Sequence, residues 1–167
     1  MEPVREISTD TLFANTFIKG WAIQLARVDE FLEATPDEDL LREIAPGKNT
    51  GIYLLGHLTA VHDAMLPLLG FGEKMYPHLE GIFVTSPDKS GKTFPSVAQL
   101  RQDWRTVNGE LMKHYTLLKP AEWLTRHEAV SSENFAREPH RNKLSVLISR
   151  TAHMAYHFGQ LIFLKKK

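Results

Sequence analysis

Between Val97 and Leu118 the apolar side chains recur at alternating steps of three and four residues without interruption. This period matches one face of an α-helix, which has about 3.6 residues per turn. Ser96 can cap such a helix at its N-terminus, and Pro120 ends it. The positions that share this face are Val97, Leu100, Trp104, Val107, Leu111, His114 and Leu118. A chain with so regular a segment is expected to build its core from packed helices.

Three further segments carry apolar residues at the same period. Asn49 or Thr50 can cap the second of the resulting four helices, and Asn142 or an earlier residue can start the last. The last helix carries an apolar face that includes Leu144, Ile148, Thr151, Ala155, Phe158 and Ile162. The four expected helices span residues 10–35, 50–70, 97–118 and 142–164.

Residues 71–95 hold several prolines and glycines and no sustained period, so they are expected to form a long connection. The strand signal is weak and is confined to Ile82–Thr85. Four helices with one or two long crossovers predict an all-α fold, a four-helix bundle. Residues 1–167 fit one domain of ordinary size.

The composition is that of a globular protein, with 43% hydrophobic and 24% charged residues. Acidic and basic residues number 20 each and form no long basic run, so nucleic-acid binding is not expected. Met1–Asp10 lacks an apolar signal segment, and no stretch approaches about 18 uninterrupted apolar residues, so we expect a cytoplasmic protein without a membrane partner. With no cysteine, a metal must be held by nitrogen and oxygen ligands, and any thiol must come from a substrate.

His153 and His157 lie four residues apart on the last expected helix. Such residues are about 40° apart around the axis and about 6 Å along it, so both imidazoles can reach one metal ion. By itself this spacing favours surface or hydrogen-bonded core histidines over a metal site, and the pair lies on the flank opposite Leu144 and Phe158. His57, on the second expected helix, is a candidate third ligand from a different element, and Gly56 beside it would permit close helix approach.

The other histidines give weaker signals. His114 replaces an apolar residue in a helical stripe and could be a fourth ligand, but a satisfied core histidine is the favoured interpretation. His62 follows His57 by five residues and is not expected to ligate from the same face. No role is assigned to the three histidines in expected loops, His78, His127 and His140.

Several familiar catalytic motifs are missing. The paired histidines enclose Met154, Ala155 and Tyr156, so the glutamate of zinc peptidases is absent. No glycine-rich phosphate loop occurs, and Ser131 and Ser132 lack the surroundings of a serine nucleophile.

Gly56-His57-Leu58 and the later segment His153–Leu161, with its His-x-x-x-His followed by Gly159-Gln160, resemble the DinB/YfiT-like superfamily of metal-binding four-helix bundles. The resemblance covers nearly the whole chain. It implies a divalent-metal site formed by His57, His153 and His157, an up-down-down-up helix order and frequent homodimers. Members with known activity look like thiol transferases that use bacillithiol, mycothiol or glutathione.

Three neutral imidazoles would leave a divalent ion its full charge and an open position for water or a thiol. We therefore expect a metal-dependent thiol S-transferase or hydrolase acting on a small molecule, with zinc or nickel as the first choices of metal. Arg150 and Tyr53 are candidates for contacts to the substrate. Candidates for orienting the imidazoles are Asp63, Thr151 and Gln160.

Two other hypotheses stay open. The chain could be a noncatalytic metal-binding or ligand-binding module, such as a stress-response protein, or the histidines could only pack inside a dimeric interaction protein. An open coordination position beside a pocket favours catalysis, whereas a closing fourth ligand such as His114 favours a structural metal. A large separation of His57 from the other two histidines would favour the packing hypothesis.

Overall fold

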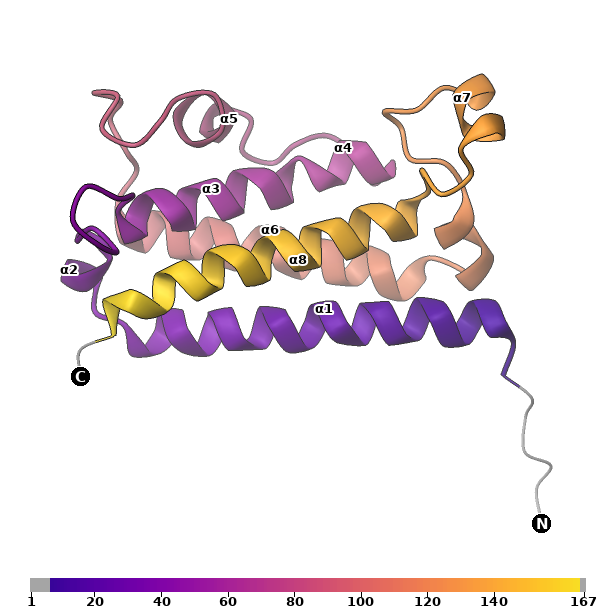
Figure 1. Ribbon diagram of the computed structural model, residues 1–167, viewed down its shortest axis with the longest axis horizontal. Coiled ribbons are helices and arrows are strands. Elements are labelled where there is room, and N and C mark those ends of the chain that lie inside the picture. The colour runs from indigo at the N-terminus through magenta and orange to yellow at the C-terminus, as the bar shows by residue number, and fades with distance from the viewer. Residues whose placement is uncertain (1–6, 166–167) are drawn as a thin grey trace, which may run out of the picture.

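The computed structural model describes residues 7–165, and in this part of the chain the regular structure is helical (Figure 1). Isolated bridges, Glu43 with Thr50 and Arg126 with Asn142, are the sole β pairings in the described range. The prediction of an all-α helical bundle is confirmed. Its long helices are α1 (Thr9–Ala34), α3 (Gly51–Asp63), α6 (Val97–Leu117) and α8 (Lys143–Leu161).

The direction of the four long helices follows the up-down-down-up order (Figure 1). α1 and α8 run the same way and pack against each other, whereas α3 and α6 run the opposite way and pack against each other. α3 also packs against α8, so these two helices are antiparallel neighbours. The crossover between α3 and α6 returns the chain to the end of the bundle where α3 began.

Side-chain caps fix where the long helices begin. The hydroxyl of Thr50 accepts the backbone N–H of Tyr53 at the start of α3, and Ser96 does the same for Gln99 in α6. Asn142 caps α8 through the N–H of Ser145. The caps predicted for the second, third and fourth long helices are therefore confirmed, with Thr50 rather than Asn49 in the second.

The second expected helix is interrupted at Ala64, after which α4 (Met65–Leu69) continues it. Pro67 explains the interruption, because proline cannot donate to the carbonyl four residues earlier and its ring collides with that carbonyl. Gly70 then ends α4 with a φ of 76°, a left-handed conformation that favours glycine.

The crossover contains a short helix, α5 (His78–Phe83), that packs on α3. The strand signal at Ile82–Thr85 is therefore wrong: its first two residues end a helix, and Val84 and Thr85 donate to the backbone oxygen of Glu80. The remaining short elements are α2 (Asp37–Leu40), a 3-10 turn η1 (Pro120–Leu124), α7 (Ser132–Arg137) and a final turn η2 (Ile162–Leu164).

Large aromatic side chains fill the middle of the bundle. Trp21, Trp104, Trp123 and Tyr115 are each at most 1% exposed. The face of α8 turned to this core differs from the predicted one, because Ile148 and Ile162 are 40% and 42% exposed and Ala155 is also exposed. The buried side chains of α8 are Leu144, Val146, Leu147, Met154 and Leu161.

In the described part of the chain, the helical segment Gly51–Leu69 is long and apolar enough to cross a membrane. Polar residues interrupt this segment, so it is not one of the uninterrupted apolar runs considered in the sequence. Its most apolar window is 78% buried inside the bundle. Burial by the other helices accounts for its composition, as for the central helix of a protein core.

Gly56 marks a close approach of α3 and α5. A Cβ built there would lie 2.5 Å from the ring of Phe83, which is fully buried and cannot swing aside. We expect Gly56→Ala to lower the free energy of unfolding by about 1–3 kcal/mol through overpacking. Gly109→Ala is the matched control, because nothing lies within 4 Å of a Cβ in the middle of α6.

The control substitution should raise stability by about 0.5–1 kcal/mol, since alanine restricts the unfolded chain and favours the helix. Denaturant unfolding of both variants measures the two effects. Equal stabilities for the two alanine variants would contradict the close packing of α5 on α3.

Candidate metal centre

His57 from α3 and His153 and His157 from α8 meet in the structure. The Nε2 atom of His153 lies 3.3 Å from Nε2 of His57 and 3.1 Å from Nε2 of His157. One ligating nitrogen from each ring lies within 4.8 Å of the others, and all three side chains are half-buried. The large separation of His57 from the pair that would favour the packing hypothesis is not found.

These separations match the geometry of a metal centre. Two imidazole nitrogens bound to one tetrahedral zinc ion at about 2.0–2.1 Å are about 3.3 Å apart. The two separations from His153 agree with this value to within a few tenths of an ångström. The packing of α3 on α8 therefore brings two of the three nitrogen separations to the spacing that a single ion requires, and all three nitrogens lie within 4.8 Å of one another.

The tautomer of His57 is fixed by the crossover. Its Nδ1 lies 2.8 Å from the backbone oxygen of Phe83, the last residue of α5, and a carbonyl oxygen can only accept. The proton therefore sits on Nδ1, and Nε2 directs its lone pair toward the other two histidines. Tyr53 stacks on the same ring with an interplanar angle of 13°, and its hydroxyl donates to the backbone oxygen of Ser86.

Gln160 fixes the tautomer of His157 in the same way. The Nδ1 atom of His157 lies 2.8 Å from Oε1 of Gln160, which accepts its proton. Of the three orienting candidates, Gln160 alone contacts a triad imidazole. The carboxylate of Asp63 instead accepts the N–H groups of Met75 and Tyr76, and the hydroxyl of Thr151 donates to the backbone oxygen of Leu147.

The electrostatics of the site favour neutral rings. Burial, followed by the neighbouring histidines, lowers the pKa of His153 to about 4, and burial also lowers the pKa of His157. Because both pKa values fall below 6.5, these two imidazoles are neutral at pH 7. The Nδ1–H tautomers of His57 and His157 direct two Nε2 lone pairs toward Nε2 of His153, which can donate to only one of them when it carries a proton. A metal ion could bind all three nitrogens at once.

His62 is a buried histidine whose position the sequence did not reveal. Its ring lies between Trp21 and Trp104, at centroid distances of 4.8 and 4.9 Å, and is fully buried. Nδ1 of His62 lies 2.8 Å from Oδ1 of Asn108, whose amide donates to the backbone of Trp104. Burial lowers the pKa of His62 to about 3, so it stays neutral. His62 therefore lies apart from the three histidines of the candidate metal centre, as predicted.

His114 lies outside the metal centre. Its ring stacks on Phe71 at 4.5 Å and an angle of 3°, and its Nε2 lies 3.4 Å from a carboxylate oxygen of Glu110. Its side chain is 29% exposed, so it is not a fully buried core residue, and it does not join the three histidines as a fourth ligand. Among residues 7–165 no cysteine, acidic residue or further histidine joins the group of three.

Arg150 stands one helical turn before His153 and lines a pocket with Leu68 of α4. The charge of Arg150 contributes to the lowered pKa of His153, so its electric field reaches the triad. Three buried nitrogens in this region have no hydrogen-bond partner within the described part of the chain: Nε of Arg150, Nδ1 of His153 and Nε2 of His62.

Comparison with known proteins identifies the family. The family model described as the DinB superfamily matches residues 21–161, which contain all three histidines of the metal centre. No curated protein matches the chain. The helix order and the positions of the three histidines agree with the resemblance noted from the sequence.

The hydrogen bond from His157 to Gln160 gives a test of the metal centre. We expect Gln160→Leu to weaken zinc binding about 10–100-fold, because the imidazole loses the acceptor that fixes its tautomer and orientation. Gln160→Glu keeps an acceptor at this position and should bind zinc at least as tightly as the wild type. Competition with a chromophoric chelator measures the affinities, and equal weakening in both variants would show that the hydrogen bond has no such role.

Proposed function

The chain belongs to the DinB superfamily, and from this premise we propose that it is a metal-dependent enzyme, a thiol S-transferase or a hydrolase. One observation carries the proposal: three imidazole nitrogens from two helices lie within 4.8 Å of one another, and both separations from His153 match those around a divalent ion. Two of the three rings have Nδ1 engaged in a hydrogen bond, so their Nε2 atoms are free to bind an ion.

The proposed centre is open rather than closed. Three ligands from the protein are typical of catalytic zinc sites, whereas structural zinc sites usually have four. Within residues 7–165 the chain offers no fourth histidine or carboxylate to the group. This supports catalysis over a noncatalytic metal-binding module, which is the alternative function.

A divalent ion held here would supply a positive charge that lowers the pKa of a bound thiol or water. The protein itself supplies neutral ligands, and so leaves the charge of the ion undiminished. It contributes no thiol, since the sequence has no cysteine. A thiol nucleophile would come from a small cosubstrate of the bacillithiol, mycothiol or glutathione type, which the family resemblance implies.

The imidazole ligands favour a metal of intermediate softness, and we propose zinc or nickel. Magnesium and calcium prefer oxygen ligands, which this centre does not offer among the described residues. The neutral state of His153 and His157 at pH 7 favours metal binding, because no proton has to leave these rings first.

We also propose that the protein is a cytoplasmic homodimer. Large apolar side chains are exposed on the neighbouring helices α1 and α8 and on η2, among them Leu12, Ile23, Tyr156 and Phe163. Large exposed apolar side chains on adjoining elements are typical of interaction surfaces. Light scattering should give twice the chain mass, and a monomer at micromolar concentrations would contradict this part of the proposal.

The metal centre is tested by elemental analysis of protein purified without a tag or chelator. We expect about one zinc or nickel ion per chain in the wild type, and its loss in both His57→Ala and His153→Ala, because the two residues lie on different helices but share one ion. His114→Ala is the matched control and should retain the metal, since this ring stacks on Phe71.

Absence of metal from the wild type, or its retention in both triad variants, would overturn the proposal. Where the wild type holds metal, thiol transfer to electrophilic acceptors should depend on it and fail in the two triad variants. Metal binding without any thiol transfer or hydrolysis would instead favour the noncatalytic module.

A further inference from the structure

A pocket of about 420 Å³ lies between α4, the loop after η1 and the first half of α8. Its apolar wall includes Leu68 and Val146, and its polar wall is formed by the side chains of His127, Ser145, Ser149 and Arg150. None of its lining residues is acidic. The pocket therefore combines one fixed positive charge with hydrogen-bonding groups and an apolar wall.

Arg150 is the residue that makes this pocket unusual. Its side chain is half-buried, its Nε is fully buried, and its guanidinium forms no hydrogen bond or ion pair with any residue from 7 to 165. By contrast, Arg126 and Arg141 at the same end of the bundle each contact a glutamate. The terminal nitrogens of Arg150 are not among the buried atoms, so their donors are open to a bound anion.

His127 adds a second donor to the same pocket. Its Nδ1 accepts the backbone N–H of Ala129 at 3.3 Å, so in the neutral ring the proton sits on Nε2. Burial lowers the pKa of His127, which keeps the ring neutral at pH 7. Ser149, which is exposed, offers a hydroxyl one residue before Arg150.

The pocket adjoins the metal centre along α8. Arg150 precedes His153 by three residues, which is about 4.5 Å along the helix axis and less than one turn. Arg150 lies toward the start of α8, the end of this helix that runs beside α4 (Figure 1). Its charge acts on His153, so a small molecule bound at the triad and extended toward the start of α8 would come close to Arg150.

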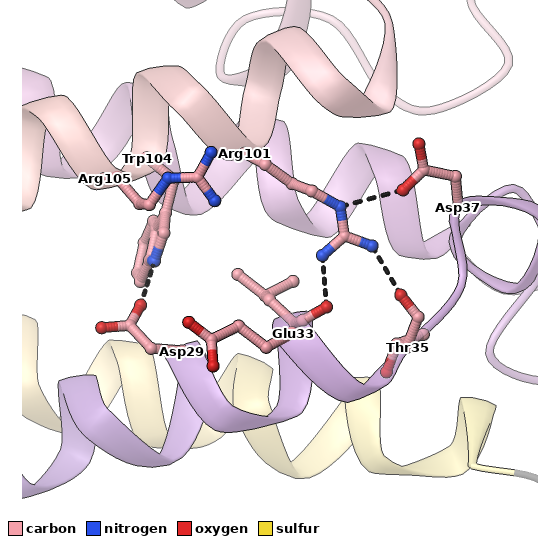
Figure 2. Close-up of a pocket in the computed structure, with 8 residues that line it drawn as sticks. Asp29, Glu33, Thr35, Asp37, Arg101, Trp104 and Arg105 are labelled. Carbon is pink, nitrogen blue, oxygen red and sulfur yellow. Dashed lines mark hydrogen bonds and ion pairs between the residues drawn. The ribbon is translucent and has the colours of Figure 1, made fainter.

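The environment of Arg150 differs from that of Arg101, which lines a cavity between α1 and α6 on the other side of the bundle (Figure 2). There Arg101 lies 3.0 Å from Asp37 and 2.6 Å from the backbone oxygen of Thr35, and it also donates to the backbone of Leu32. Its donors are already used to hold α6 to the end of α1. Asp29 and Glu33 also line that cavity, which makes it a poor anion site.

We propose that the pocket around Arg150 is an anion subsite that binds a carboxylate group of the small molecule that reaches the metal centre. The guanidinium would form paired charge-assisted hydrogen bonds to the carboxylate, with His127 and Ser149 as additional donors. The role of this subsite in substrate binding rests on the proposed function. The affinity of the subsite for a carboxylate is independent of the proposed function, because the residues that line the subsite are not metal ligands.

The subsite is tested with two matched probes, succinate and its neutral analogue succinamide, added to the metal-loaded protein. Backbone amide chemical shifts of Ala129, Ser149 and Arg150 report binding in the pocket. We expect saturable shifts with succinate and none with succinamide. Arg150→Gln should weaken succinate binding about 10–100-fold, because it removes the charge and the paired donors. Arg150→Lys keeps the charge alone and should have an intermediate effect.

Arg105→Gln, on the far side of the bundle, is the matched control and should bind succinate as the wild type does. The spectra themselves show whether each variant is folded. Equal binding of both probes, no saturable shift with succinate, or wild-type affinity in Arg150→Gln would overturn the subsite.

The metal-free variant His57→Ala separates this proposal from the proposed function. Succinate should still bind at Arg150 in that variant, because His57 does not line the pocket. Binding there, together with a wild type that holds no metal, would leave the anion subsite standing and remove the metal-dependent activity. If the wild type holds metal but does not bind succinate, the metal centre stands and the anion subsite is overturned.

Discussion

The candidate metal centre depends on the antiparallel packing of α3 against α8, because this contact brings one histidine from α3 to a pair on α8. His153 and His157 share a helix and could meet by spacing alone, but His57 reaches them only through the tertiary fold. The crossover secures this arrangement, since Phe83 packs over Gly56 and its backbone oxygen holds the His57 ring. The long connection is therefore part of the site as well as a link between helices.

The sequence predicted the long helices, and it predicted most of their caps, because apolar period and capping chemistry are local properties. It did not predict the core face of α8, where Leu147 and Met154 are buried and Ile148 is exposed, since apolar residues surround much of this helix. The end of helix α5 carries a weak strand signal instead of a helical one. A helix this short is stabilised by packing on its neighbours, so its sequence need not show a helical period. The hydrogen bond from His157 to Gln160 was one of several candidates, and only side-chain positions could select it.

The fixed charge that Arg150 places beside the triad is positive. The three candidate ligands are imidazoles, burial lowers the pKa of His153 and His157, and the cation of Arg150 also contributes to the lowered pKa of His153. No carboxylate joins the group among the described residues. With a divalent ion bound, this region would attract anions, and a thiolate at the ion and a carboxylate at Arg150 would each be stabilised. The proposed activity and the anion subsite are thus consistent with the same electric field.

X-ray absorption spectroscopy of the zinc-loaded protein tests the central claim most directly, because it reports the atoms around the ion. The account predicts nitrogen or oxygen neighbours at about 2.0–2.1 Å with the multiple-scattering pattern of three imidazoles, falling to two in His57→Ala protein loaded with excess zinc. A wild-type spectrum with oxygen neighbours and no imidazole signal, or one unchanged by the substitution, would contradict the convergence of the three histidines on one ion.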